Sequence, residues 1–320
     1  MPKLKDVLVL YKFDEDMKKR LVEMNPDANY VYAKPAEVTR EQLEKAEIIL
    51  GSLAPDKVEG LENLKWMQLW SAGSDAFHRN GKFPSGAILT NGSGGYGLTI
   101  AEYITGTLLM LMRKLDRAYK NQLECKWEKV GAITSIYGSR ILIVGLGNLG
   151  GEFGVRAKAL GAHITGVRRS NDKPKPDFAD EVYTADKLDE LLPLADVVVL
   201  SVPDTGETQK LMSKERIAKL KKGSILINVG RGTAVDTNAL ADALENGDIY
   251  GAALDVTDPE PLPADHRLWK APNIIITPHI SGGHELPETY RRLCEIALAN
   301  YDAFVNDKPM KNVVDFKKGY

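Results

Sequence analysis

The 320-residue sequence is poor in cysteine and has no excess of charge of either sign. Its two cysteines, Cys125 and Cys294, are far apart and follow no metal-ligand spacing. We therefore expect reduced thiols, with neither a disulfide framework nor a bound metal. Lys and Arg total 42 against 44 for Asp and Glu, which gives a net charge of −2. This balance gives no reason to expect nucleic acid or an anionic membrane as a partner.

The sequence also lacks long apolar runs. No run approaches the ~20 apolar residues of a membrane span, and the N-terminal apolar stretch is too short for a signal peptide. The expected location is therefore the cytoplasm. Hydrophobic and charged contents of 43% and 27% are typical of a soluble globular protein, and the length favours two domains over a single core.

The first hundred residues predict a small α/β domain. Short apolar runs suit buried parallel strands at 7–10, 48–50 and 66–70. Polar segments with helical spacing lie between them, and one opens with a capping-box pattern of Thr39 and Gln42. The apolar stretch 101–113 that follows predicts a largely buried helix.

A second and stronger alternation of strands and helices fills the middle of the chain. Six buried strands are predicted there, at 140–144, 163–167, 197–201, 224–229, 251–255 and 274–277. Strands that alternate with helix-length segments indicate a doubly wound parallel sheet. The stretch 286–305 then predicts a helix that leaves this domain.

A GxGxxG motif from Gly145 to Gly150 follows the first of these six strands and opens a helix. Gly145 allows a tight turn, Gly147 lets the backbone approach a pyrophosphate, and Gly150 lets the helix pack close to the sheet. Amides at the helix N-terminus then face the negative charge. Another glycine-rich run, 92–97, follows no long strand and is expected to open a helix only later, so we interpret it as a flexible loop.

The turn after the second strand bears on the choice of dinucleotide. An acid that binds the adenosine ribose hydroxyls is usual there, but this chain has Arg168, Arg169 and Ser170. Two guanidiniums and a hydroxyl suit a 2′-phosphate, which a carboxylate would repel. The alternative is a solvated basic turn. We expect NADP(H) to be favoured, and NAD(H) stays open.

Arg231, Glu260 and His279 each come just past the end of a predicted strand. Taken singly, such residues are commonly a surface ion pair, a loop charge and a structural histidine. Together they fall at the carboxyl edge of the sheet, where ligands of open α/β sheets bind. Reduction of a carbonyl builds negative charge on its oxygen and needs a preplaced cation and a proton donor. The three residues thus predict a nicotinamide-dependent dehydrogenase.

The segment 227–263, INVGRGTAVDTNALADALENGDIYGAALDVTDPEPLP, and the following NIIITPHISG resemble the signature region of the D-isomer-specific 2-hydroxyacid dehydrogenases. WSAGSD in the first domain and IAEY near residue 100 extend the resemblance over nearly the whole chain. It implies an oxidoreductase that transfers a hydride between NADP(H) or NAD(H) and a small 2-keto or D-2-hydroxy acid, similar to hydroxypyruvate and glyoxylate reductases. The sequence does not choose among the keto acids.

The resemblance also implies a fold and its domains. A Rossmann nucleotide-binding domain, residues 102–285, is inserted into a smaller flavodoxin-like, discontinuous substrate domain formed by 1–101 and 286–320. Both domains would be doubly wound α/β. The family is generally dimeric, which implies a homodimer with the segment around Trp127 as a candidate interface.

Site roles follow from the same resemblance. Arg231 would bind the substrate carboxylate and polarise the keto oxygen, His279 would protonate that oxygen, and Glu260 would orient His279. The substrate carboxylate would also be held by Ala72, Gly73 and Ser74. Cofactor binding is expected at the strand ends, by Gly145, Gly147, Asn148, Leu149, Gly150, Arg168, Arg169, Ser170, Val202, Pro203, Thr208, Val229, Gly230, Arg231, Asp255, His279, Ser281 and Gly282. Among these, Asp255 would bind the carboxamide end.

Two other functions are compatible with the motifs. Non-enzymatic redox sensors similar to this family keep the same triad, although they usually carry disordered tails that this sequence lacks. Formate- or phosphite-type dehydrogenases share the fold. The formate enzymes replace the glutamate partner of the histidine with glutamine, whereas this chain has Glu260.

Overall fold

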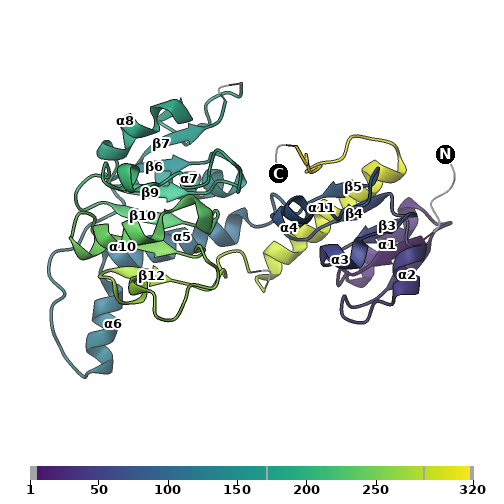
Figure 1. The fold of residues 1–320 in the computed structure, drawn as a ribbon, viewed down its shortest axis with the longest axis horizontal. Helices are drawn as coiled ribbons and strands as arrows, with labels where there is room; N and C mark the ends of the chain where they lie inside the picture. The colour runs from purple at the N-terminus through teal and green to yellow at the C-terminus, as the bar shows by residue number, and fades with distance from the viewer. Residues whose placement is uncertain (1–5, 171, 284, 318–320) are drawn as a thin grey trace. The chain divides into compact units, whose positions relative to one another are not determined.

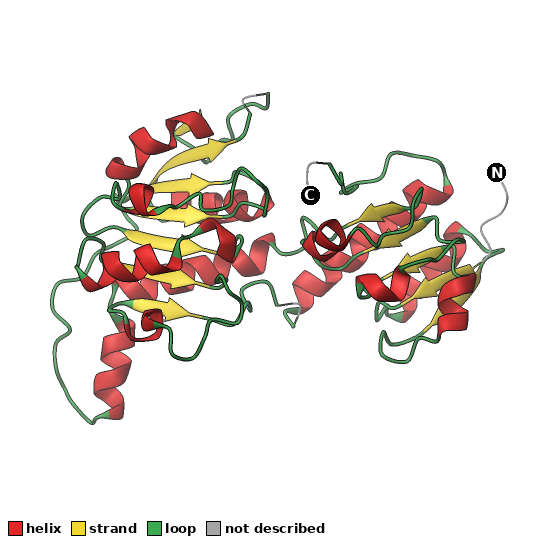
Figure 2. Ribbon diagram, in the orientation of Figure 1, coloured by secondary structure: helices red, strands yellow, loops and turns green. Residues whose placement is uncertain are grey.

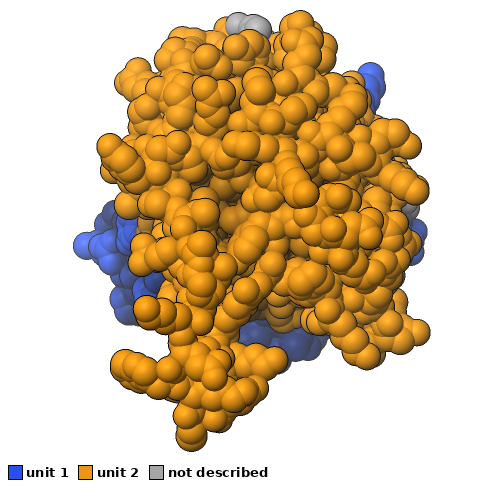
Figure 3. Space-filling model, turned by 90° about the vertical axis from the view of Figure 1, so that its left-hand side faces the viewer, with its two compact units in different colours: residues 1–96, 284–320 blue, residues 97–283 orange. Residues whose placement is uncertain are grey.

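The computed structural model describes residues 6–170, 172–283 and 285–317. Two compact units divide the chain: residues 1–96 with 284–320, and residues 97–283 (Figure 3). The boundaries expected from the sequence, 101 and 286, differ from these by a few residues. The first break coincides with the start of helix α5 (Gly97–Met112), which belongs to the second unit.

The first unit contains a five-stranded parallel sheet in the order β2-β1-β3-β4-β5. This is the flavodoxin-like order, as the resemblance implies. The strands are β1 (Asp6–Val9), β2 (Asn29–Tyr32), β3 (Ile48–Leu50), β4 (Trp66–Gln68) and β5 (Ile88–Thr90). Strands β2 and β5 were not predicted, because both are edge strands that are not buried along their whole length.

Helices of the first unit are α1 (Glu15–Met24), α2 (Arg40–Lys45), α3 (Pro55–Val58), α4 (Asp75–Asn80) and α11 (Pro287–Val305). The predicted capping box of α2 is present, with Thr39 and Gln42 each bonded to the other's backbone amide. Helix α11 belongs here because it buries one face at helical spacing, Leu293, Cys294, Ala297, Leu298 and Tyr301. It also packs on α1, where Arg20 and Glu295 form a bidentate ion pair.

The second unit contains a seven-stranded parallel sheet in the order β12-β11-β10-β9-β6-β7-β8. Figure 2 shows its strands as arrows that point the same way. The strands are β6 (Arg140–Val144), β7 (His163–Arg168), β8 (Glu181–Thr184), β9 (Val197–Leu200), β10 (Ile225–Asn228), β11 (Gly251–Leu254) and β12 (Ile274–Ile276). The central order is that of a Rossmann fold. The six predicted strands are all present, and β8 is an additional edge strand.

Helices of the second unit are α5, α6 (Leu115–Leu123), α7 (Asn148–Ala159), α8 (Leu188–Leu191), α9 (Lys214–Ile217) and α10 (Thr237–Glu245). Helix α5 buries Ile100, Ile104, Leu108 and Leu111 along one face. It begins directly at Gly97, so the prediction that the 92–97 run opens a helix only later was wrong. Helix α6 buries none of its residues and projects from the unit (Figure 1). Within the described ranges, no helix is both long and apolar enough to cross a bilayer.

Candidate active site

The turn from β6 to α7 is built by glycine at two positions that no other residue could occupy. Gly145 has φ of +103°, and a Cβ there would lie 2.7 Å from the Ser201 carbonyl oxygen. A Cβ on Gly150 would lie 2.1 Å from the Gly145 carbonyl oxygen. The backbone therefore closes tightly on itself, and α7 begins against the sheet.

Gly147 differs from these two glycines because nothing in the chain requires its small size. A Cβ built at Gly147 meets no atom within 4 Å. Gly147 is the N-cap of α7, and no side chain caps the helix there. An open space in front of uncapped helix amides fits the pyrophosphate of a dinucleotide. The position thus fits the cofactor-binding prediction for Gly147, Asn148 and Leu149.

Arg168 is the last residue of β7, one position further than the strand was predicted to extend. Its guanidinium donates to the backbone carbonyls of Lys173 and Pro174. The Ser170 hydroxyl donates to the Asp172 carboxylate, at 2.5 Å. That hydrogen bond lowers the pKa of Asp172. The turn thus holds the predicted basic residues, together with one carboxylate that the sequence analysis did not consider.

The remaining predicted cofactor residues follow the ends of β9, β10, β11 and β12, so they share one edge of the sheet with the glycine turn. After β9, Val202 is buried and Pro203 is exposed. The Thr208 hydroxyl donates to the Pro203 carbonyl at 2.6 Å and accepts from the Thr205 amide at 2.8 Å. Thr208 therefore closes the 203–208 turn.

Arg231 follows β10 in a segment that hydrogen bonds from the Asn228 side chain hold in place. The Asn228 side chain accepts from the Gly230 amide at 3.1 Å and donates to the Arg231 carbonyl at 2.9 Å. The Arg231 Nη1 donates to the Gly230 carbonyl at 2.8 Å, and the side chain is half-buried. These bonds hold the guanidinium close to the end of β10, beside Val229 and Gly230.

His279 and Glu260 form the closest functional pair in this unit. His279 Nδ1 lies 2.6 Å from Glu260 Oε1, and the two side chains are 51% and 43% exposed. Because an ionised carboxylate only accepts, Nδ1 carries the proton in this bond. The Nε2 atom makes no hydrogen bond to any residue that the structure describes. It is available to a ligand.

Asp255 follows β11 and holds the turn that carries His279. Its buried carboxylate accepts from the Thr277 hydroxyl at 2.7 Å, the Ile280 amide at 2.8 Å and the Ser281 amide at 3.0 Å. His279 itself has φ of +54°, and its amide donates to the Asp255 carbonyl at 2.9 Å. A non-glycine residue in this region costs ~1–3 kcal/mol and persists only where surrounding contacts impose it.

The sequence analysis missed this supporting role of Asp255 and the residue that extends it. The Tyr103 hydroxyl lies 2.6 Å from the Thr277 hydroxyl, and burial raises the pKa of Tyr103 to about 12. Tyr103 lies in the IAEY segment that carries part of the resemblance. No spacing rule links residues 103, 255 and 277, so only the folded chain brings them together.

The predicted carboxylate loop, Ala72–Ser74, follows β4 in the first unit. The Ser71 hydroxyl donates to the Gly73 carbonyl at 2.8 Å, and the Ser74 hydroxyl lies 3.0 Å from His78 Nε2. The backbone amides of Ala72, Gly73 and Ser74 donate to no described residue. Three such amides in sequence are suited to binding an anion. Across the described ranges, no cluster of His, Cys, Asp or Glu could hold a metal ion.

Comparisons with known proteins agree with this geometry. The family model "D-isomer specific 2-hydroxyacid dehydrogenase, NAD binding domain" matches residues 105–281. A hydroxypyruvate reductase from Thermotoga maritima is 32% identical over 80% of this chain and 87% of its own length.

Solved structures agree as well. A D-isomer-specific 2-hydroxyacid dehydrogenase family protein from Aeromonas salmonicida is 31% identical, with a TM-score of 0.85 over 98% of this chain and 99% of that one. An NADPH-dependent glyoxylate/hydroxypyruvate reductase from Sinorhizobium meliloti, in complex with NADP and sulfate, is 25% identical, with a TM-score of 0.82 over 99% and 100% of the two chains.

The chain belongs to the D-isomer-specific 2-hydroxyacid dehydrogenase family. It is an NAD(P)-dependent oxidoreductase that interconverts small 2-keto and 2-hydroxy acids. The predicted fold class, family and reaction class are therefore confirmed.

Proposed function

We propose that His279 protonates the keto oxygen of the substrate while Glu260 holds the imidazole. The observation that carries this role is the 2.6 Å bond from His279 Nδ1 to Glu260, which leaves Nε2 to face the substrate. A carboxylate on Nδ1 fixes the tautomer and stabilises the protonated ring. The bound nicotinamide supplies the hydride. In the reverse direction His279 accepts the proton.

Arg231 neutralises the substrate carboxylate and polarises the carbonyl in this proposal. A guanidinium carries five donors in a fixed fork, and the bond to the Gly230 carbonyl uses one of them to orient the group. Negative charge that develops on the carbonyl oxygen then meets a preplaced cation. The amides of Ala72, Gly73 and Ser74, which donate to no described residue, are likewise proposed to bind a carboxylate.

Asp255 is better assigned to positioning than to the cofactor carboxamide. Three protein donors already occupy its buried carboxylate. The dinucleotide would lie along the glycine turn and the following strand ends. It would contact Gly145, Gly150, Val202, Pro203, Val229, Ser281 and Gly282, all at the carboxyl edge of the second sheet.

We propose NADP(H) as the preferred cofactor. Arg168 and Arg169 offer guanidiniums to a 2′-phosphate, and no carboxylate stands at the end of β7 to accept from ribose hydroxyls. Asp172 works against this preference, because its carboxylate lies beside Ser170 and would repel a 2′-phosphate. A charge-assisted contact at an exposed edge is worth about 1 kcal/mol, which is roughly a fivefold preference for NADPH.

The proposed substrates are small 2-keto acids of the glyoxylate and hydroxypyruvate class, as the names of the relatives suggest. The unpaired cysteines and the nicotinamide chemistry favour a cytoplasmic setting. The deciding experiment compares reduction of glyoxylate, hydroxypyruvate and pyruvate with NADPH and with NADH. Failure to reduce any 2-keto acid with either cofactor would refute the assignment. Equal efficiency with both cofactors would refute only the NADP(H) preference.

We also propose a homodimer formed through α6 and the segment after it. The exposed large apolar residues there are Leu115, Tyr119, Leu123, Trp127, Ile133 and Tyr137, and Trp127 is fully exposed. Six such side chains within 23 residues exceed the scattered exposure normal for a monomer. In a twofold dimer the same surface of each subunit meets in the interface. A second copy of this segment would therefore bury these apolar side chains.

A further inference from the structure

The first unit contains a cavity of about 550 Å³ that the proposed reaction does not use. Its lining comes from the ends of β1 and β2, the residues that follow β1, β2 and β4, Lys18 on α1, and the first turns of α11. In a sheet of order 2-1-3-4-5, ligands bind outside the carboxyl ends near β1, where the strand order reverses. The volume lies within the range of small-molecule sites, roughly 300–1,000 Å³.

Aromatic rings form one continuous wall of this cavity. The Tyr11 ring stacks on Phe13 with centroids 5.5 Å apart and meets the edge of Trp70 at 5.7 Å. Tyr290 from α11 lies 6.5 Å from Tyr11. Both tyrosine hydroxyls already bond to the chain, since Tyr11 donates to the Leu69 carbonyl and Tyr290 accepts from the Lys12 amide. Tyr11 and Phe13 are nearly buried, so the wall offers ring surface mainly from the half-buried Trp70 and Tyr290.

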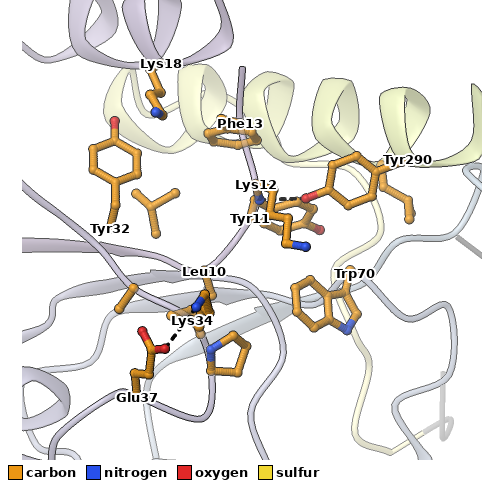
Figure 4. A pocket seen from close by; sticks show the side chains of 14 residues that line it. Leu10, Tyr11, Lys12, Phe13, Lys18, Tyr32, Lys34, Glu37, Trp70 and Tyr290 are labelled. Atoms are coloured by element: carbon orange, nitrogen blue, oxygen red, sulfur yellow. Dashed lines mark hydrogen bonds and ion pairs between the residues drawn. The ribbon is translucent and has the colours of Figure 1, made fainter. Parts of the chain in front are cut away.

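Three lysines line the cavity, and they differ in their partners. Lys18 pairs with Glu15 at 2.7 Å and Lys34 with Glu37 at 3.0 Å. Lys12 forms no ion pair with any residue that the structure describes. Figure 4 shows its side chain directed toward the Trp70 ring. An exposed cation beside an aromatic wall is complementary to an anion that carries a flat apolar body.

We propose that this cavity binds a small carboxylic acid with an aromatic ring, with the ring against Trp70 and Tyr290 and the carboxylate on Lys12. The carboxylate on Lys12 is not the substrate carboxylate that Arg231 binds in the proposed reaction, so the ligand is a separate aromatic acid that regulates the enzyme. Trp70 connects the cavity with the proposed carboxylate loop. Its amide donates to Ser52 and its carbonyl accepts from the Tyr96 hydroxyl, so the start of the loop is fixed.

The first test titrates phenylacetate, which has no keto group to reduce, into the full chain by calorimetry. Acetate supplies the carboxylate without the ring, and benzyl alcohol supplies the ring without the carboxylate. We expect saturable 1:1 binding of phenylacetate and at least tenfold weaker binding of each control. No saturable binding, or equal binding of all three compounds, would overturn the proposal.

Substitution of Lys12 tests the carboxylate partner. Lys12 is exposed and contributes its backbone amide, not its ammonium, to the bond with Tyr290, so Lys12→Ala should fold normally. We expect about fivefold weaker phenylacetate binding, the effect of one exposed ion pair of about 1 kcal/mol. Lys19→Ala is the matched control, because Lys19 lies on α1 outside the cavity lining. Equal affinities in the two variants would remove Lys12 from the site.

Kinetics with glyoxylate then test the regulatory role. Phenylacetate that competes fully with the keto acid would overturn that role. Inhibition or activation that keto acid does not relieve supports a separate regulatory site. The binding test needs no turnover, so it can succeed or fail independently of the proposed keto-acid reduction.

Discussion

Replacing Asp255 with asparagine should loosen the turn that presents His279. The carboxylate is 2% exposed and takes three donors, two on Oδ1 and one on Oδ2. An asparagine side chain has one oxygen. If that oxygen keeps Thr277 and Ile280, the amide nitrogen faces the Ser281 N–H, and two donors oppose each other in a buried place.

The size of the expected loss in stability follows from the burial of these groups. A hydrogen bond to a charged group contributes ~1.5–3 kcal/mol, and leaving a buried donor unsatisfied costs ~1–3 kcal/mol. These two estimates overlap, so we expect a loss of about 2–3 kcal/mol in the free energy of unfolding of the second unit. For a domain of this size that corresponds to a Tm lower by roughly 5–10 °C. Solvent does not screen the effect, because Asp255 and Ser281 are both buried.

Scanning calorimetry and steady-state kinetics would measure the two consequences. The kcat for keto-acid reduction should fall at least about tenfold, because a misplaced catalytic group loses much of its effect. Asp242→Asn is the control. Its carboxylate makes a surface ion pair with Arg267 at 2.7 Å, and such pairs contribute ~0–1 kcal/mol. If Asp255→Asn matches this control in Tm and in kcat, Asp255 does not support the His279 turn.

Further substitutions test the other assignments. His279→Ala should lower kcat by about 10²-fold or more, the usual effect of losing a general acid, with cofactor affinity little changed; an unchanged kcat would exclude His279 from proton transfer. Arg231→Lys keeps the charge but loses the fork, so kcat/KM should fall by more than about tenfold; kcat/KM within a factor of about two of wild type would contradict the clamp. Arg168→Asp should abolish or reverse the preference for NADPH over NADH without changing the KM of the keto acid. The same preference in variant and wild type would show that Arg168 does not read the 2′-phosphate. Trp127→Glu places a charge in the proposed dimer surface and should shift sedimentation toward the monomer; a monomeric wild-type protein at micromolar concentration would refute the dimer.

The sequence predicts most of the second unit because its signals are local. Strands such as Ile225–Asn228 are fully buried on both faces and read as unbroken apolar runs. Edge strands lack this signal. In β8, Glu181–Thr184, every residue is exposed or half-exposed, so its pairing with β7 depends on tertiary context. Four strand ends in this unit were predicted one residue too long, at Ser201, Val229, Asp255 and Thr277, because the sequence does not mark where the ladder pairing stops.

Some residues of the candidate site have a local sequence signal and others do not. Motifs at strand ends predict Gly145, Gly150, Arg231 and His279. The acceptor role of Asp255 and its link to Tyr103 through Thr277 cannot be predicted, because Asp255 and Tyr103 are 22 and 174 positions from Thr277 in sequence. The aromatic cavity was also missed. The sequence analysis gives no pattern that would bring Tyr11 together with Tyr290.

Arg231 and His279 are positioned by different physical means. A Cβ on Gly230 would lie 2.6 Å from the Val202 carbonyl oxygen, and one on Gly232 would lie 1.9 Å from that of Thr257. The segments after β9 and β11 thus pack on both sides of Arg231, and this close packing, with the hydrogen bonds from Asn228, sets its backbone. His279 instead depends on hydrogen bonds to Asp255, which hold a backbone conformation that the residue would not otherwise adopt. A polar substitution near Asp255 should therefore displace His279, the proposed proton donor. Added bulk at Gly230 or Gly232 should instead displace the Arg231 guanidinium.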